Sequence, residues 1–471
     1  MARRTRLLAL VTLAMVNVIT LAAGIAVARM LPGRLAALKI PAVAPARVSV
    51  PDPVLPAGLP DGPLPTASGL RSALAGPLSA GSLGPSVLSM VADPATGRVL
   101  LSDGGSQLAT PASTTKLATA VAALAALGGG ARFTTRVVSG GDSVILVGGG
   151  DPTLAVSSYP PGNYPRPATL ASLAAATAAR LRAGGRTSVR LGYDTSLYSG
   201  PGLAPGWPAA YVTTGNVTQV SSLEVDQGRL TGSGTPEDSD NPYNLTPRAP
   251  RPAEMAAAAF AGLLRSDGIK VTGPVAGQAA PRGAQVLAAI SSPPVSAIAE
   301  QMLAESNNVI AESLARQVAI ATGEPATFAG AAAAEIRVLR GLGITGGIQL
   351  VDGSGLSPED AIAPAALVKV LEAAIARPRL RPALASLPVA GFSGTLAARE
   401  SVFAGIGGSA LGAVRAKTGN LGTVAALAGL VYDKDGRLLV FAIMADKVAQ
   451  LDHAAAAIDA AAGNLAGCGC R

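Results

Sequence analysis

The chain is poor in the side chains from which many hydrolytic and redox sites are built. Its 471 residues include one histidine, His453, and two cysteines, and aromatic residues make up 3% of the sequence. A hydrolase with a Ser-His-Asp triad commonly places its serine in a G-x-S-x-G turn, and the sequence contains no such turn. We therefore expect His453 to be a surface residue, and any serine chemistry here must use a base other than histidine.

The two cysteines, Cys468 and Cys470, both lie within the last four residues. Two cysteines cannot form a disulfide framework, and they cannot complete a four-ligand zinc site. We expect no metal and no other cofactor. For the cysteine pair itself two alternatives stay open: an unstructured tail, or a local or intermolecular disulfide.

Basic residues outnumber acidic ones, but no block of them is interleaved with aromatic residues. The net charge is +8, and 30 of the 37 basic residues are arginine. A nucleic-acid-binding surface usually combines a basic patch with such aromatic residues, so we do not expect nucleic acid as a partner. The charge indicates attraction to an anionic envelope polymer or membrane surface, or a genome that favours arginine codons.

The N-terminus combines a basic flank with an apolar run. Three arginines in residues 1–6 precede the 22 uncharged residues 7–28, a length that can span a bilayer. A cleavable signal peptide usually has a shorter apolar stretch, although residues 26–28 (Ala-Val-Ala) could serve as a cleavage site. We expect residues 1–30 to form an uncleaved signal anchor, with a cleaved signal as the alternative. In both cases we expect the rest of the chain in the cell envelope, outside the cytoplasm.

The remaining chain divides by composition. Residues 31–69 are expected to form a linker, because nine prolines fall in 31–65 without an amphipathic period. Short strands, glycine turns and proline-rich loops characterise residues 131–289, which we expect to be a β-rich inserted region. Residues 70–130 and 290–467 are expected to form one discontinuous domain.

Secondary structure is predicted most clearly at the two ends of this discontinuous domain. Apolar runs around a turn predict strands at 86–93 and 98–101, and an Ala/Leu-rich helix follows from about residue 111 to 127. Further elements are predicted in the C-terminal part: helices at 295–304 and 309–321, strands at 414–418, 424–431 and 438–444, and a final helix at 454–462. Strands at both ends with helices between them predict an α/β (α+β) sandwich.

Two of the seven lysines belong to short motifs, and a third motif lies between them. The motifs are Ser113-Thr-Thr-Lys116, Ser306-Asn-Asn308 and Lys417-Thr-Gly419. Residues three apart lie on one face of a helix, so Lys116 should lie beneath Ser113 at the start of the helix that ends near residue 127. The N–H groups at a helix N-terminus also favour negative charge near that serine.

A lysine can replace histidine as the base only when it is neutral. Burial and a second positive charge nearby both lower the pKa of a lysine. We expect Lys116 to be the buried base, with Lys417 supplying the second charge if the fold brings the two together.

Beyond the three motifs, four longer stretches carry a family resemblance. They are 111–117 (PASTTKL), 146–154 (LVGGGDPTL), 305–308 (ESNN) and 352–357 (DGSGLS). Over residues 70–465 the chain resembles the low-molecular-mass class C penicillin-binding proteins, the D-alanyl-D-alanine carboxypeptidase/endopeptidase family. The resemblance implies a serine β-lactamase/transpeptidase-like catalytic domain interrupted by a large inserted region. The 352–357 stretch either borders the site or is a plain glycine turn.

The resemblance also implies catalytic roles. Ser113 would be the acylated nucleophile, Lys116 would accept its proton, and Ser306 would relay a proton to the leaving D-alanine. Backbone N–H groups of Ser113 and Asn420 would stabilise the oxyanion. The expected partners are peptidoglycan peptides that end in D-Ala-D-Ala, and β-lactam antibiotics.

Four side chains and one glycine are implied to bind the substrate. Asn308 would contact its amide, Lys417 and Thr418 would hold its terminal carboxylate, and Gly419 would let its backbone approach the strand closely. Asn420 stands where the family usually has threonine, so the backbone donor is kept and the side-chain contact is changed.

Two other classes of function stay open: a β-lactamase or esterase of the same fold, and a non-catalytic envelope scaffold. A class A β-lactamase needs an E-x-x-L-N motif after S-x-N, but no asparagine occurs between Asn308 and Lys417. A scaffold would be indicated by a broken motif, and all three motifs are intact. The sequence therefore favours the peptidase.

Overall fold

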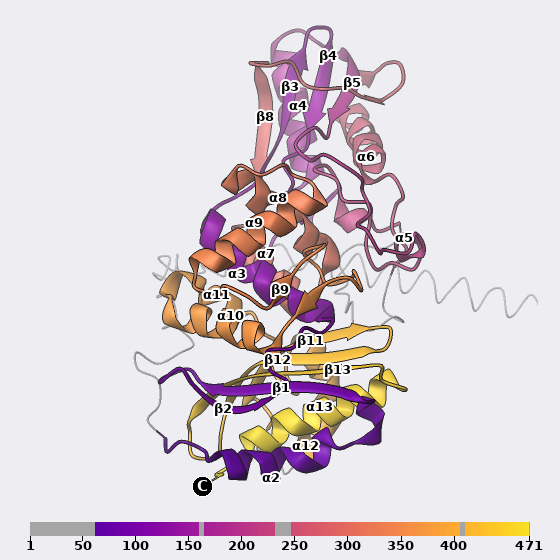
Figure 1. Ribbon diagram of the computed structural model, residues 1–471. Helices are drawn as coiled ribbons and strands as arrows, with labels where there is room; N and C mark the ends of the chain where they lie inside the picture. Colours follow the sequence, from indigo (N-terminus) through magenta and orange to yellow (C-terminus); the bar gives the residue numbers. More distant parts are fainter. Residues whose placement is uncertain (1–61, 160–163, 231–245, 406–409, 471) are drawn as a thin grey trace, which may run out of the picture. The chain divides into compact units, whose positions relative to one another are not determined.

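The computed structural model describes residues 62–159, 164–230, 246–405 and 410–470 (Figure 1). Contacts divide the chain into residues 1–54 and residues 55–471, and every described residue belongs to the second unit. The expected anchor at 1–30 and most of the expected linker therefore lie outside the described residues. Among the residues that are described, no helix is long and apolar enough to cross a membrane.

A helix starts slightly before the expected residue 70. Helix α2 spans Ala67–Leu78, and the Thr66 hydroxyl caps it by accepting a hydrogen bond from the Gly69 N–H at 3.1 Å. The last residues of the linker expected at 31–69 are therefore helical, because a threonine cap starts a helix that composition alone did not indicate.

A five-stranded sheet combines strands from the N-terminal and C-terminal parts of the described residues. Its strand order is β11-β12-β13-β1-β2, and all neighbours are antiparallel. The strands are β1 (Ser86–Asp93), β2 (Arg98–Asp103), β11 (Val414–Leu421), β12 (Val424–Tyr432) and β13 (Leu438–Asp446). The strands predicted in these places are confirmed, and each of the last three runs one to three residues further than predicted.

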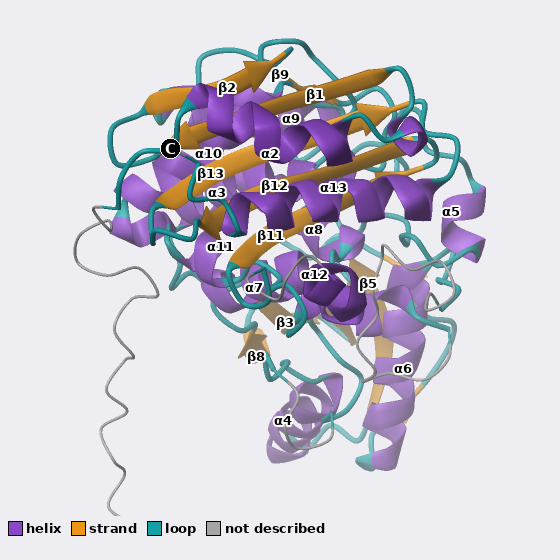
Figure 2. Ribbon diagram, turned by 90° about the horizontal axis from the view of Figure 1, so that it is seen from below, coloured by secondary structure: helices purple, strands orange, loops and turns teal. Residues whose placement is uncertain are grey.

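Both faces of this sheet are covered. Alternate residues of a strand point to opposite faces, and in β12 Ala426 and Ala428 enter one core while Ala425 and Leu427 enter the other. A strand that is buried on both faces is nearly continuously apolar, which is the pattern of β12 and β13. Figure 1 shows α10 and α3 on one face, and Figure 2 shows α2 and α13 across the other.

The first core lies among helices that are rich in alanine and leucine. Its centre is α3 (Thr115–Leu127), in which every residue from Thr115 to Leu124 is buried. Around it lie α7 (Val295–Ala304), α8 (Asn308–Thr322), α9 (Phe328–Gly341), α10 (Pro364–Ala376) and the short α11 (Pro382–Ala385). Small side chains let these helices pack closely, which explains how a chain with few aromatic residues fills its interior. A two-stranded ribbon, β9 (Ile348–Gln349) and β10 (Ala361–Ile362), lies between α9 and α10 in sequence.

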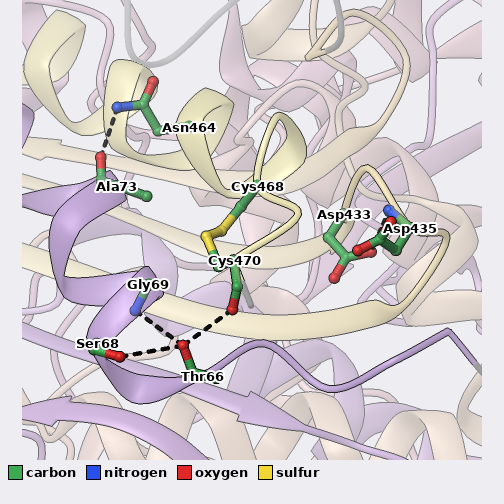
Figure 3. The surroundings of a disulfide bond; sticks show 9 residues. All are labelled: Thr66, Ser68, Gly69, Ala73, Asp433, Asp435, Asn464, Cys468 and Cys470. Atoms are coloured by element: carbon green, nitrogen blue, oxygen red, sulfur yellow. Dashed lines mark hydrogen bonds between the residues drawn. A yellow bond between two sulfur atoms is a disulfide. The ribbon is translucent and has the colours of Figure 1, made fainter.

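The second core lies under α2, α12 (Glu400–Gly405) and α13 (Leu451–Ala466). His453 is exposed on α13, as expected. After α13, Cys468 and Cys470 form a local disulfide, and the Thr66 hydroxyl donates to the Cys470 carbonyl at 3.2 Å (Figure 3). The Thr66 N–H donates to the same carbonyl at 2.6 Å. Of the two alternatives for the cysteine pair, the structure therefore has the local disulfide.

A second sheet occupies the chain between α3 and α7. Its order is β6-β5-β4-β3-β8, with β7 paired to β5. These strands are β3 (Thr134–Gly140), β4 (Ser143–Val147), β5 (Ser188–Asp194), β6 (Lys270–Val271), β7 (Ala276–Gly277) and β8 (Val286–Ser291). Antiparallel β3 and β4 lead into parallel pairing of β4 with β5.

The segment carries strands, as expected, but its regular structure is not β alone. It also contains α4 (Leu170–Ala183), α6 (Pro252–Ser266) and the short α5 (Ala210–Thr213). Helices α4 and α6 carry 14 and 15 residues and pack on the sheet through a shared apolar core. The sequence does contain a helix signal for α4: Thr169 is an N-cap, and the buried residues recur every three or four positions. The many glycines and prolines around it favoured the prediction of turns and strands.

Candidate active site

Ser113 lies on a tight turn that feeds α3. Residues Ala112–Thr114 form a 3-10 turn, so Ser113 precedes the α-helix and does not lie within its first turn as expected. Ala112 has a φ of 46°, a left-handed conformation that is unfavourable for a residue with a side chain. The Thr114 hydroxyl fixes the turn by donating to the Pro111 carbonyl at 2.6 Å. Ser113 itself is 6% exposed.

Lys116 lies beneath Ser113, as the motif spacing predicts. Its side chain is fully buried, and Nζ is 2.8 Å from Ser113 Oγ. Nζ also donates to Asn308 Oδ1 at 2.7 Å and to the Ser354 carbonyl at 2.8 Å. A separation of 2.8 Å is short enough for direct proton transfer between the serine and the lysine.

The second motif lies on the connection between α7 and α8. Ser306 is buried and has a φ of 55°. Asn307 caps α8 by accepting from the Ile310 N–H at 3.1 Å. Asn308 begins the helix, and its Nδ2 donates to the Asn216 carbonyl at 2.9 Å while its Oδ1 faces Lys116. A helix cap therefore sets the direction of the asparagine that meets the lysine.

The third motif lies on β11, one of the two edge strands of the five-stranded sheet. Lys417 is fully buried, and its Nζ donates to Ser306 Oγ and to the Thr418 carbonyl, each at 2.8 Å. The Thr418 hydroxyl is 2.8 Å from the Thr395 hydroxyl. The second and third motifs are thus joined directly, through one serine and one lysine.

Gly419 explains how β11 approaches the Ser113 turn. A Cβ on Gly419 would lie 2.7 Å from the Pro111 carbonyl oxygen and 3.2 Å from the Thr114 nitrogen. Both atoms belong to backbone that cannot move without shifting the turn. The structure therefore gives this glycine a reason besides the expected access for substrate: only glycine lets the strand lie against the turn that carries Ser113.

The outer edge of β11 is hydrogen-bonded at its start, whereas the Asn420 N–H near its end has no backbone partner among the described residues. The Ala416 N–H donates to the Pro388 carbonyl at 3.0 Å, on the side away from β12. Backbone N–H groups alternate between the two edges of a strand, so the N–H of Asn420, four residues on, faces the same outer edge. The Asn420 residue is half-buried.

The 352–357 stretch borders the site and is not a detached glycine turn. The Ser354 carbonyl contacts Lys116, as described above. Gly355 has a φ of 80°, and a Cβ there would lie 1.9 Å from the Ala112 carbonyl oxygen. The stretch therefore packs directly under the turn of Ser113.

Several residues at the site were not predicted from the sequence. Asn307 Nδ2 donates to Gln227 Oε1 at 2.7 Å, and Gln227 has a φ of 55°. Gln227 and Asn216 reach the second motif from the segment between α3 and α7, and Thr395 reaches the third from the 3-10 helix before α12. No local pattern marks such residues, because only the folded chain brings them to the motifs. Across the described ranges, no group of three or more His, Cys, Asp or Glu side chains is arranged to hold a metal ion.

These features define a class of site: a buried serine in contact with a lysine at the entrance to a helix, with a second serine–lysine pair beside the edge strand β11. Comparison with known families gives the particular family. The model of the D-Ala-D-Ala carboxypeptidase 3 (S13) family matches residues 70–246 and 229–465, and the chain belongs to this family.

Individual relatives agree. The chain is 39% identical over 417 residues to carboxypeptidase DacB of Mycolicibacterium smegmatis, with 87% of this chain and 86% of the relative covered. It is 31% identical over 428 residues to the D-alanyl-D-alanine carboxypeptidase of Actinomadura sp. strain R39, with 74% and 76% covered.

The fold also matches a solved structure. Penicillin binding protein 4 of Haemophilus influenzae superposes with a TM-score of 0.69 at 24% identity, over 85% of this chain and 98% of that chain. The mixed α/β architecture predicted from the sequence is thereby confirmed.

Proposed function

We propose that the protein is a serine D-alanyl-D-alanine carboxypeptidase or endopeptidase that acts on peptidoglycan stem peptides through an acyl-enzyme on Ser113. The observation that carries the proposal is the 2.8 Å contact between Lys116 Nζ and Ser113 Oγ in a buried site. The family, and the relatives named as carboxypeptidases, support the same reaction.

Acylation begins with proton transfer from Ser113 to Lys116. A neutral amine has two N–H groups and one lone pair. The two carbonyl-type oxygens at Nζ, Asn308 Oδ1 and the Ser354 carbonyl, can only accept hydrogen bonds. They take the two N–H groups and leave the lone pair for the Ser113 hydroxyl. As Oγ attacks the carbonyl carbon of the penultimate D-alanine, its proton moves to Nζ, and the resulting ammonium has an acceptor for each hydrogen.

The leaving group needs the proton back. When the C–N bond breaks, the nitrogen of the terminal D-alanine must gain a proton. Ser306 would give it its hydroxyl proton and be reprotonated by the proton that Lys116 took up, while Lys417 Nζ, 2.8 Å from Ser306 Oγ, holds that hydroxyl in place. Hydrolysis then uses water as the nucleophile: the water gives a proton to Lys116 and its oxygen to the acyl carbon, and Lys116 returns that proton to Ser113 Oγ as the ester bond breaks.

Substrate binding is assigned to the open part of the β11 edge. A peptide in an extended conformation can add to an exposed strand edge through backbone hydrogen bonds. The outward N–H of Asn420 would then complete an oxyanion site with the N–H of Ser113. Lys417 and Thr418 would bind the terminal carboxylate, and Asn308 has a second Nδ2 hydrogen for the substrate amide. β-Lactams, which present a similar carboxylate and carbonyl, are expected to acylate the same serine.

The direct test is release of D-alanine from a peptide that ends in D-Ala-D-Ala. The full-length protein should release one D-alanine per peptide cleaved, and Ser113→Ala should abolish the release while its melting temperature stays near that of the wild type. Release by Ser113→Ala at the wild-type rate would contradict the assignment.

The location of the protein is a separate proposal. Its support is the basic flank and the apolar run of residues 7–28, which fit a signal anchor that leaves the enzyme outside the cytoplasmic membrane, where its substrate lies. N-terminal sequencing of the native protein tests it. An intact N-terminus is expected, and a mature protein that starts at Arg29 would show a cleaved signal.

A further inference from the structure

The 352–357 stretch is held by an unusually complete set of hydrogen bonds around one carboxylate. Asp352 Oδ1 accepts from the N–H groups of Ser354 and Gly355 at 2.9 and 2.6 Å. Its Oδ2 accepts from the Ser357 N–H and from Trp207 Nε1, both at 2.7 Å. These bonds fix the shape of the loop, but they do not fix its distance from Lys116.

Two neighbouring helices hold the Gly353 residue from opposite sides. Glu312 Oε1 on α8 accepts from the Gly353 N–H at 3.1 Å, and the Thr119 hydroxyl on α3 donates to the Gly353 carbonyl at 2.6 Å. Glu312 lies four residues after Asn308 and Thr119 lies three residues after Lys116, so each shares a helix face with a residue of the site. Helix α3, which carries Lys116, and α8, which carries Asn308, therefore each bind the loop through a side chain one turn further along the helix.

These two hydrogen bonds at Gly353 set the position of the next carbonyl along the chain, that of Ser354. A Cβ on Gly353 would lie 2.7 Å from the Ala315 Cβ, so the loop rests on α8, and Gly355 is pressed under Ala112. Between these two glycines lies Ser354, whose carbonyl accepts from Lys116 Nζ at 2.8 Å. A loop fixed at Gly353 and Gly355 leaves that carbonyl no freedom to move away from the lysine.

We propose that Glu312 and Thr119 are positioning residues for the acylation step: by holding Gly353 they keep the Ser354 carbonyl on Lys116 Nζ, which aims the lone pair of the neutral amine at Ser113. The inference rests on the proposed function, because it assigns a purpose to contacts of the proposed base. If the Ser354 carbonyl moved away, an N–H of Lys116 would compete with the lone pair for the Ser113 oxygen.

The charges around Glu312 are consistent with a hydrogen-bonding role. The Glu312 side chain is 1% exposed. Its burial is the main cause that raises its pKa to about 8, and the negative charge of Asp352 raises it further, whereas the positive charge of Arg316 lowers it. Burial also raises the pKa of the neighbouring Glu335, and burial and Asp352 raise that of Asp360. At neutral pH Glu312 is therefore mainly an uncharged carboxylic acid, which glutamine closely imitates.

The test separates acylation from binding in the full-length protein. Penicillin acylation is followed at several concentrations, which yields the dissociation constant of the non-covalent complex and the rate constant of acylation, k2. For Glu312→Ala we expect k2 to fall by at least about fivefold with the dissociation constant changed by less than about threefold, because positioning of the base acts on the chemical step. Glu312→Gln keeps an acceptor for the Gly353 N–H and should stay within about threefold of the wild-type k2. Thr119→Val, which removes only the hydroxyl, should behave like Glu312→Ala.

A matched control addresses general destabilisation. Asp459 is another carboxylate that is 1% exposed, but it lies on α13 across the sheet and pairs with Arg399 at 3.0 Å. Asp459→Ala should lower the melting temperature and leave k2 of the folded protein unchanged.

Three results would overturn the inference. They are a smaller loss of k2 than about fivefold in Glu312→Ala, an equal loss in Glu312→Gln and Glu312→Ala, and an equal loss in Asp459→Ala. If Glu312→Ala does not fold, Thr119→Val replaces it in the test, and a loss of k2 smaller than about fivefold in that variant would overturn the inference. Failure of the proposed function would be seen separately, in a wild-type protein that penicillin does not acylate at Ser113.

Discussion

Lys417 Nζ and Ser306 Oγ lie 2.8 Å apart, although 111 residues separate them in the sequence. Lys417 is also tied to its own strand through the Thr418 carbonyl. The lysine is therefore fixed at both the strand and the α7–α8 connection, where Ser306 adopts a left-handed backbone with a φ of 55°. Strained backbone of this kind persists only where surrounding contacts hold it, and it is common at active sites.

The two lysines should respond differently to replacement by arginine. Lys116 has to be neutral to take the serine proton, and arginine does not lose its proton near neutral pH. We expect Lys116→Arg to lose at least about a hundredfold in the rate of penicillin acylation. Stopped-flow or gel-based acylation of the full-length protein measures this loss. Acylation by Lys116→Arg at the wild-type rate would exclude Lys116 as the base.

Lys417 is expected to act as a fixed charge. Lys417→Arg keeps the charge and should retain part of the acylation rate, with weaker binding of substrates that have a terminal carboxylate. Lys417→Ala removes the charge, so Lys116 is protonated more readily and the acid limb of the acylation profile should move to higher pH. The profile is measured from pH 5 to pH 10 in both proteins. An acid limb that stays in place without Lys417 would contradict this role.

The buried carboxyl of Glu312 predicts a pH dependence of stability. Burial and Asp352 raise its pKa from 4.5 to about 8 in the folded state. Between these values the folded protein holds a proton that the unfolded chain has lost, so the free energy of unfolding falls as pH rises from about 4.5 to about 8. Glu312→Gln cannot titrate, and its stability relative to the wild type should therefore increase from pH 5 to pH 8. Denaturant unfolding at pH 5, 7 and 8 gives this difference, and a constant difference would be the contrary result.

Gly355 should be among the glycines least tolerant of change. It combines a φ of 80° with a position at which a Cβ would lie 1.9 Å from the Ala112 carbonyl oxygen. We expect Gly355→Ala to destabilise the fold by at least about 3 kcal/mol and to abolish acylation, because the turn of Ser113 must shift. Gly262 on α6 is the control: a Cβ there meets no atom within 4 Å, and Gly262→Ala should stabilise the protein by up to about 1 kcal/mol. Thermal unfolding of both variants tests the contrast, and equal effects would refute it.

The parts of the fold that the sequence predicted are those with a strong local signal. Strands β12 and β13 are continuous apolar runs around a glycine turn, and α7 ends where the Ser306 motif begins. Helix α4 was not predicted, because the glycine and proline turns on either side of it outweighed the helical period of its apolar residues. The displacement of Ser113 from α3 into a 3-10 turn depends on the φ of 46° at Ala112, which an alanine gives no reason to expect.

The same distinction holds for the site. All the motif residues could be identified, because their spacing within each motif is short and specific. Their supports could not: Gln227, Thr395 and Glu312 reach the motifs only after folding, and the purpose of Glu312 depends on a backbone N–H of Gly353. The sequence patterns identify the motif side chains, whereas the contacts that orient these side chains form only in the folded chain.

Mass spectrometry can locate the covalent intermediate that we propose on Ser113. The full-length protein is incubated with a penicillin, digested, and examined by mass spectrometry for the modified peptide. We expect a single adduct, on Ser113, which is lost in Ser113→Ala while the variant keeps its melting temperature. An adduct on any other serine, or an undiminished adduct in Ser113→Ala, would contradict it.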